Sequence, residues 1–219
     1  MHSLYVTGTD TGVGKTHASV ALLHALRARG LRVAGMKPVA AGCQRVDGQW
    51  RNDDALALQA ASDRAAPYAE LNSFALPLPS APQLAARAAG VRVDLAVLAD
   101  AFERLQARAD AVVVEGAGGW LAPFDDGLEQ SALVRRLQLP VVLVVGMRLG
   151  CLNHARLSAR VIADDGCRLL GWIGNAVEAG FDDNGDYARL LQQQLPAPCL
   201  GLLAHGMSPV EAAANLRLP

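Results

Sequence analysis

Short apolar runs alternate with longer segments of helical periodicity along most of the chain. Continuous runs of branched apolar residues predict strands over residues 3–8, 32–39, 110–116, 140–146 and 168–175. Helices are expected after the first strand, where Gly30 supplies a stop signal, and over 152–164 and 183–195. Another helix is expected where Leu98, Ala101, Phe102 and Leu105 share one face, with Asp94 as its N-cap.

This alternation predicts an α/β fold with a doubly wound, mostly parallel sheet. The strands are uniformly apolar, which is typical of strands buried on both faces. Ligands then bind at the carboxyl ends of the strands. A length of 219 residues favours a single domain spanning 1–219. The proline-rich segment 74–82 is expected to be an ordered loop over the site.

Composition narrows the partners to small molecules. The formal net charge is −1, so neither nucleic acid nor an anionic membrane surface is expected to bind. The four cysteines lie far apart and have no zinc-ligand spacing. We find no apolar run long enough to cross a bilayer and no room for a signal peptide before the first strand, so a cytoplasmic location is expected.

The segment "GTDTGVGKT", which lies between the first strand and the first helix, predicts a phosphate-binding loop. The usual pattern has four residues between its two glycines, whereas five separate Gly8 from Gly14, and Thr9 stands where the first glycine belongs. An ordinary glycine turn is the alternative. The helix start that follows favours an anion, and Gly12 and Gly14 give the backbone freedom to present N–H groups.

Four side chains are candidates for phosphoryl-transfer chemistry. The hydroxyl of Thr16 and the carboxylates of Glu115 and Asp54 are hard ligands of the kind that Mg²⁺ prefers. Lys37, held extended by Pro38, could neutralise developing phosphate charge. The alternatives are an acid that only ends a strand for Glu115, a residue at a helix start for Asp54, and a surface lysine for Lys37.

Asn175 ends the last predicted strand, from which its amide could bind the edge of a purine. A turn residue is the alternative for this single asparagine. The histidines show no spacing that suggests a metal site, and His17 and His24 are expected on the first helix.

Together these motifs resemble the dethiobiotin synthetase family. The resemblance spans residues 6 to about 155 and rests on "VTGTDTGVGKT", "AGMKPVAAG", "RNDDALALQ", "VEGAGGW" and "VVGMRLGCLNHA". The family shares the five-residue spacer. The resemblance implies a P-loop NTP hydrolase-like fold and a homodimer. It also implies an ATP- and Mg²⁺-dependent reaction that joins 7,8-diaminononanoate and CO2 in a ring to give dethiobiotin. The implied intermediates are a carbamate and a carbamic–phosphoric anhydride.

The resemblance also implies residue roles. Lys37 and Lys15 would be catalytic, and Thr16, Asp54 and Glu115 would bind Mg²⁺. Nucleotide contacts would come from Gly12, Val13, Gly14, Lys15, Thr16, His17, Asp54, Glu115, Gly116, Ala117, Gly118, Asn175, Ala176, Ala204, His205, Gly206 and Glu211. Substrate contacts would come from Thr11, Lys37, Ala41, Gly118, Leu149, Gly150, Cys151, Leu152 and Asn153.

Two of these assignments carry further expectations. The segment around Asn153 is expected to reach across the dimer and to receive the substrate carboxylate of the other subunit at a helix start, where Asn153 could equally be the helix cap. Many members of the family have serine where this chain has Ala41. Loss of that hydroxyl predicts weaker substrate binding and the same reaction, at a cost of about 1 kcal/mol.

Related classes of protein fit less well. The regulatory ATPases that partition plasmids or place division sites carry a signature lysine at the position of Asp10. A GTPase would need Asn-Lys-x-Asp near the fifth strand. The cobyrinic acid amide synthases append an amidotransferase domain, for which a chain ending at Pro219 has no room. A pure binding module would leave Lys37, Asp54 and Glu115 without a joint purpose.

Overall fold

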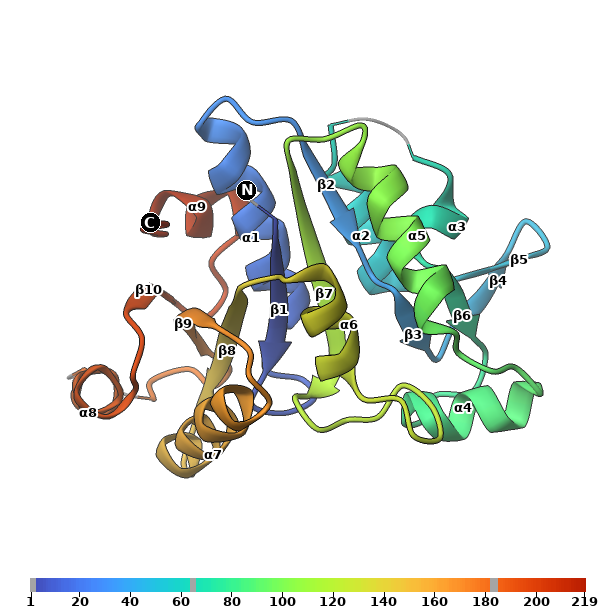
Figure 1. Ribbon diagram of the computed structural model, residues 1–219. Helices are drawn as coiled ribbons and strands as arrows, with labels where there is room; N and C mark the ends of the chain where they lie inside the picture. The colour runs from blue at the N-terminus through green and yellow to red at the C-terminus, as the bar shows by residue number, and fades with distance from the viewer. Residues whose placement is uncertain (1–2, 64–65, 182–184) are drawn as a thin grey trace.

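The computed structural model describes residues 3–63, 66–181 and 185–219 and is built on a six-stranded sheet. The strands are β1 (Leu4–Gly8), β2 (Val33–Met36), β7 (Ala111–Gly119), β8 (Val141–Met147), β9 (Leu169–Ala176) and β10 (Cys199–Leu203). Their order is β10-β9-β8-β1-β7-β2, and every pairing is parallel (Figure 1). This confirms the predicted doubly wound α/β fold.

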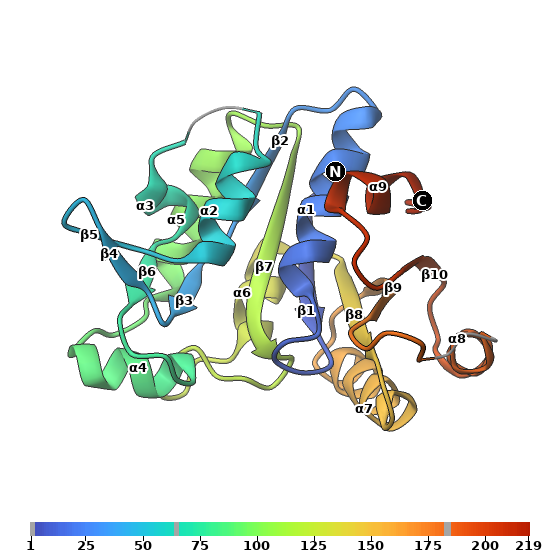
Figure 2. The same ribbon diagram turned by 180° about the vertical axis from the view of Figure 1, so that it is seen from behind.

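Helices cover both faces of the sheet and bury two apolar layers. One face carries α5 (Leu95–Gln106), α6 (Gln130–Leu137), α7 (Cys151–Asp164) and α8 (Asp186–Gln194). The helix α4 (Pro82–Ala89) contributes to the same apolar layer but packs against residues 39–41 and 74–76. The other face of the sheet carries α1 (Lys15–Ala28), α2 (Asp53–Ala60) and α9 (Pro209–Ala214) (Figure 2). Successive strand residues contribute to opposite layers, as Tyr5 and Val6 do.

The expected strand 32–39 is wrong in one respect, because it is divided into two strands. β2 ends at Met36, and β3 (Val39–Ala41) pairs with β6 (Phe74–Leu76) in a separate two-stranded sheet. Pro38 has no N–H to donate to a ladder, which accounts for the break. The expected loop 74–82 is wrong at both ends, because residues 74–76 form β6 and Pro82 begins α4, so only residues 77–81 are a loop.

Several other expectations are confirmed and some elements were not anticipated. Asp94 caps α5, and α7 and α8 lie where helices were expected, although residues 183 and 184 of the predicted helix lie outside the described residues. The elements not anticipated are α3 (Tyr68–Leu71), α4, α6, α9, β10 and the hairpin of β4 (Gln44–Val46) and β5 (Gln49–Arg51). The single domain 1–219 stays a prediction.

Among the helices in the described part of the chain, none has the length and apolar character needed to cross a bilayer.

Candidate functional site

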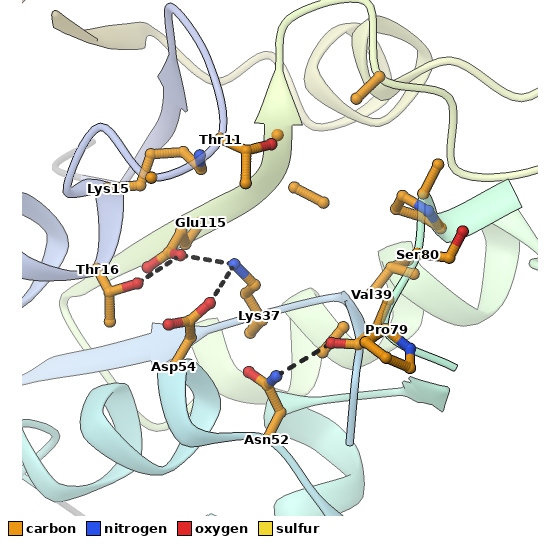
Figure 3. Close-up of a pocket in the computed structure, with 18 of the residues that line it drawn as sticks. Thr11, Lys15, Thr16, Lys37, Val39, Asn52, Asp54, Pro79, Ser80 and Glu115 are labelled. Atoms are coloured by element: carbon orange, nitrogen blue, oxygen red, sulfur yellow. Dashed lines mark hydrogen bonds and ion pairs between the residues drawn. The ribbon is translucent and has the colours of Figure 1, made fainter. Parts of the chain in front are cut away.

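A cavity of about 700 Å³ opens where β1, β2 and β7 end. It is bordered by the loop after β1, the residues after β2, the start of α2 and the segment between β6 and α4 (Figure 3). Its lining residues are Thr11, Gly12, Gly14, Lys15, Thr16, Lys37, Val39, Ala40, Ala41, Asn52, Asp54, Pro79, Ser80, Ala81, Pro82, Glu115, Ala117, Gly118 and Ala122. The cavity thus lies at the sheet edge predicted for the ligand.

The loop after β1 leads directly into the start of α1. Gly14 is the N-cap residue with φ +85°, and a Cβ at this position would lie 2.2 Å from Nδ2 of Asn175, so only glycine fits. No side chain of the described residues caps α1. Its first N–H groups therefore have no side-chain cap, and Gly14, Lys15 and Thr16 line the cavity, as an anion site requires.

Lys15 is buried and folds back over this loop, where its Nζ donates to the carbonyl of Asp10 at 3.1 Å. Burial, together with the nearby ammonium of Lys37, lowers the pKa of Lys15 to about 8, although Glu115, Asp54 and Asp10 oppose the shift. Phosphate oxygens at the helix start would hold Lys15 in its charged form.

Lys37 lies directly after β2, and its ammonium is held between two acids. Nζ donates to Oε1 of Glu115 at 2.6 Å and to the carbonyl of Gly116 at 3.1 Å, and it lies 3.1 Å from Oδ2 of Asp54. Thr16 donates its hydroxyl to the same Oε1 of Glu115 at 3.0 Å (Figure 3). Side chains from β7 and α2 therefore converge on one lysine, and a side chain from α1 bonds the same oxygen of Glu115.

The ionisation of this cluster follows from its burial and its pairing. Burial by itself would lower the pKa of Lys37, but the charges of Glu115 and Asp54 outweigh it and raise that pKa. For Asp54, burial acts to raise the pKa, and the ammonium of Lys37 with the hydroxyl of Thr16 brings it below its ordinary value. Lys37 is therefore an ammonium at neutral pH, beside an ionised Asp54.

A second set of hydrogen bonds fixes the backbone on either side of the Lys37–Asp54 pair. Asn52 is the N-cap of α2, and its backbone N–H donates to the hydroxyl of Tyr68 at 2.8 Å. Tyr68 donates to Oδ1 of Asn72 at 3.1 Å, and the Asn72 amide donates to the carbonyl of Lys37 at 2.7 Å. The network joins the helix that carries Asp54 to the residue that carries the ammonium.

The donor set fits a magnesium ion that also binds nucleotide. Oε2 of Glu115 is buried and has no hydrogen-bond partner among the described residues. The carboxylate of Asp54 and the hydroxyl of Thr16 supply further hard oxygens. Within the part of the chain that the structure describes, no cluster of three His, Cys, Asp or Glu side chains could hold a metal by itself. Phosphate oxygens would have to complete the coordination.

The predicted site residues divide into two groups in the structure. Those that line the cavity together are Thr11, Gly12, Gly14, Lys15, Thr16, Lys37, Ala41, Asp54, Glu115, Ala117 and Gly118. The predicted contacts to the base lie elsewhere. Ala176, Ala204 and His205 line a separate hollow, and Glu211 forms a capping box with Ser208 at the start of α9.

Further predicted nucleotide residues, Val13 among them, do not line the cavity. The amide of Asn175 donates to the carbonyl of Val13 at 3.0 Å, which ties the end of β9 to the phosphate-binding loop. His17 lies in the first turn of α1, where burial lowers its pKa. Gly116 contributes its carbonyl to Lys37. Gly206 lies in the turn after β10.

The predicted substrate contacts at the start of α7 lie outside the cavity. Gly150 is the N-cap residue, so the alternative of Asn153 as the cap is wrong: Asn153 lies in the first helical turn and is exposed. Leu149 is 81% exposed, whereas Cys151 is buried. Leu152 packs against the apolar layer that contains Cys151. None of the residues 149–153 lines the cavity, and the substrate contacts predicted for this segment stay a prediction.

The structure also adds residues that were not singled out from the sequence. Asn52 lines the cavity besides capping α2, and Val39, Ala40 and Ala122 form part of its wall. Pro79 to Pro82 border it too, which agrees with the expected loop over the site. Small apolar residues such as Ala40 and Ala122 carry no chemical signal by which the sequence could have identified them.

Comparison with known proteins agrees with this geometry. Residues 2–206 match the family described as an AAA domain. The chain is 54% identical to the ATP-dependent dethiobiotin synthetase BioD of Xanthomonas euvesicatoria, over 99% of this chain and 98% of that protein. It is 53% identical to the protein of the same name from Xylella fastidiosa, over 99% and 97% of the two chains.

Solved structures share the fold at much lower identity. The signal recognition particle receptor FtsY of Elizabethkingia anophelis superposes with a TM-score of 0.60 at 18% identity, covering 100% of this chain and 62% of that one. The cell division protein MinD of Aquifex aeolicus superposes with a TM-score of 0.56 at 14% identity, covering 98% of this chain and 87% of that one. These likenesses show the fold alone. The identity of 53–54% to the two synthetases, over 99% of this chain, shows the family as well. The chain belongs to the ATP-dependent dethiobiotin synthetase family.

Proposed function

We propose that the protein joins 7,8-diaminononanoate and CO2 in a ring to form dethiobiotin, and that the reaction converts ATP into ADP and phosphate. The observation that carries the proposal is the buried ammonium of Lys37, which lies between Glu115 and Asp54 in the same cavity as the phosphate-binding loop. A cation so placed can balance the charge of a carbamate and of a phosphoryl group that approaches it.

The proposed reaction has three steps. One amine of the substrate adds to CO2 and loses a proton, which gives a carbamate. A carbamate oxygen then attacks the γ-phosphorus of ATP and ADP leaves, which gives a mixed anhydride. The second amine attacks the carbamoyl carbon, the C–O bond to phosphate breaks, and the amine proton is lost as the five-membered urea closes. Positioning and charge balance carry most of this work.

Each residue of the cluster has a defined part in these steps. Lys15 and the N–H groups at the start of α1 bind the phosphates. Lys37 stabilises the carbamate and the phosphoryl group in transfer. Thr16, Asp54 and Glu115 would hold Mg²⁺. When bound, that ion neutralises charge on the phosphates. Asn175 and the residues near Ala204 and Glu211 are proposed to contact the base.

We also propose a homodimer in which the start of α7 of one subunit completes the substrate site of the other. Two features support this: the exposed Leu149, and Asn153 in the first turn of a helix whose N-cap residue, Gly150, offers no side chain. A carboxylate is favoured at such a helix start. A cytoplasmic location is supported by the four cysteines, all of which are thiols rather than disulfides.

The alternative function is that of a regulatory ATPase, and the geometry of the site does not support it. At the position of the signature lysine of such ATPases, Asp10 accepts hydrogen bonds from its neighbour Thr11 and from Arg148, at 2.7 and 2.6 Å. An acid that pairs with the loop after β8 cannot supply the charge of a lysine.

The direct test is incubation of the purified protein with diaminononanoate, bicarbonate, Mg²⁺ and ATP, followed by mass spectrometry. Dethiobiotin formed with one ADP per molecule supports the proposal. ATP hydrolysis without that product would favour a regulatory ATPase instead.

A further inference from the structure

Gln130, the first residue of α6, is fully buried beneath the end of β7. Its Nε2 lies 2.8–2.9 Å from the carbonyl oxygens of Ala117, Gly119 and Ala122, which share its two N–H hydrogens, and its Oε1 accepts from the backbone N–H of Ala117 at 3.1 Å. One side-chain amide thus binds several backbone groups of a single short segment. The backbone N–H of Ala117 fixes which end of the amide is the acceptor.

These backbone groups belong to an irregularity in β7. Val6 of β1 pairs with Glu115 and Gly8 with Gly119, so two residues along β1 correspond to four along β7. The extra residues form a bulge at Gly116–Gly118, which leaves backbone groups without a strand partner. At Ala117 the Gln130 amide both donates and accepts, as a residue of a neighbouring strand would.

Tyr5 holds the Gln130 amide from the other side. Its hydroxyl donates to Oε1 at 2.7 Å, and its ring packs edge-on against Trp120 with centroids 6.3 Å apart. Burial, with the charge of Glu115 nearby, keeps the pKa of Tyr5 well above its ordinary value, so the phenol remains a donor. A Cβ on Gly116 would lie 2.3 Å from Oε1 and 2.5 Å from the Tyr5 hydroxyl.

The bulge forms part of the cavity wall. Its Gly116 carbonyl accepts from Lys37, and Ala117, Gly118 and Ala122 line the cavity. We propose that Gln130, held by Tyr5, is a positioning residue that sets this bulge, and with it the cavity wall that meets the diamine. This inference rests on the proposed reaction and adds to it a residue that does not line the cavity.

The test compares variants of the full-length enzyme by three measurements. Gln130→Met keeps the length of the side chain and removes its polar ends, whereas Gln130→Glu keeps the acceptor and removes the donor. Ser3→Ala is the matched control, because buried Ser3 accepts from Val112 N–H at the opposite end of the same strand. Hydrogen exchange of the amides of residues 116–119, kcat and KM for the diamine, and affinity for a fluorescent ATP analogue are measured for each.

For Gln130→Met and Gln130→Glu we expect amide exchange in the bulge to rise, and kcat/KM for the diamine to fall by about tenfold. Affinity for the nucleotide analogue should stay within about twofold, since the hydrogen bonds of the Gln130 amide go to Tyr5 and to the segment after Glu115 and reach neither α1 nor its loop. Ser3→Ala should change neither bulge exchange nor diamine kinetics. Tyr5→Phe keeps the Gln130 amide and should give a smaller fall in kcat/KM for the diamine than the Gln130 variants. This variant replaces Gln130→Met in the test if Gln130→Met does not fold.

Unchanged bulge exchange or unchanged diamine kinetics in both Gln130 variants would overturn the inference, as would an equal loss in Ser3→Ala. A parallel loss of nucleotide affinity would show a general structural role and would also overturn it. A native protein that makes no dethiobiotin would instead refute the proposed reaction, while the exchange measurement would still decide whether Gln130 holds the bulge.

Discussion

Nζ of Lys37 lies 2.6 Å from Oε1 of Glu115, and both side chains are buried. A buried ion pair costs desolvation free energy that its attraction barely offsets, so stability alone is a weak reason for it. The pair is directed into a cavity that also contains a phosphate-binding helix start. An arrangement of this kind is typical of sites that stabilise charge as it develops.

Replacing Lys37 by alanine should nearly abolish ring closure. The variant loses the ammonium that balances the carbamate and the phosphoryl group, so we expect kcat to fall by about 10²–10³-fold. Binding of ATP should remain measurable by calorimetry, because Lys37 is not part of the helix start. Near-normal production of dethiobiotin by this variant would remove Lys37 from the mechanism.

Replacing Glu115 by glutamine should weaken binding of Mg²⁺ and ATP together. The amide keeps the shape of the carboxylate but removes the charge that makes it a hard ligand. Titration of activity against Mg²⁺ should therefore give a higher half-saturating concentration. A titration identical to that of the native protein would mean that Glu115 only ends the regular part of β7.

The Tyr68–Asn72 network gives a prediction about positioning. Tyr68→Phe removes the hydroxyl that joins Asn52 to Asn72, so the free energy of unfolding should fall by about 1–3 kcal/mol. Because the network orients Lys37 and Asp54, kcat should also fall, with little change in the KM for ATP. Chemical denaturation and steady-state kinetics measure the two effects, and a stability loss with native kcat would show that the network is purely structural.

The proposed dimer predicts complementation between two defective variants. Asn153→Asp places a negative charge where the substrate carboxylate would bind, and Lys37→Ala removes the ammonium. If a site uses Lys37 of one subunit and Asn153 of the other, mixed dimers contain one intact site. Mixing equal amounts under exchange conditions should restore about a quarter of native activity. Failure to recover activity, with exchange verified by mass, would place both residues in one chain's site.

The fold was largely predictable because its strands are continuous apolar runs separated by clear stop signals. Hydrophobic periodicity locates β1, β7, β8 and β9, and Asp94 predicts the start of α5. The hairpin of β4 and β5 was not predicted, although Asp47-Gly48 is a turn signal in the sequence. Both residues have positive φ in a two-residue connection, as such a turn requires. β10 was missed because a five-residue run at the sheet edge has no distinct period.

The cavity was partly predictable for a different reason. Charged residues at strand ends, such as Lys37 and Glu115, carry a chemical signal, and parallel topology brings them together. Gln130 carries no such chemical signal. Its burial beneath a bulge depends on a register shift in β7, and a register shift is a property of the folded sheet that no local pattern of residues reveals.

The most direct test of the central claim is the fate of oxygen from the carbamate. Diaminononanoate is incubated with ¹⁸O-labelled bicarbonate, ATP and Mg²⁺ for a time short enough to limit exchange with water, and the phosphate released is examined by mass spectrometry. The proposed mixed anhydride predicts that one labelled oxygen appears in phosphate for each dethiobiotin formed. Dethiobiotin accompanied by unlabelled phosphate, with label still present in the bicarbonate, would contradict phosphorylation of the carbamate at this site.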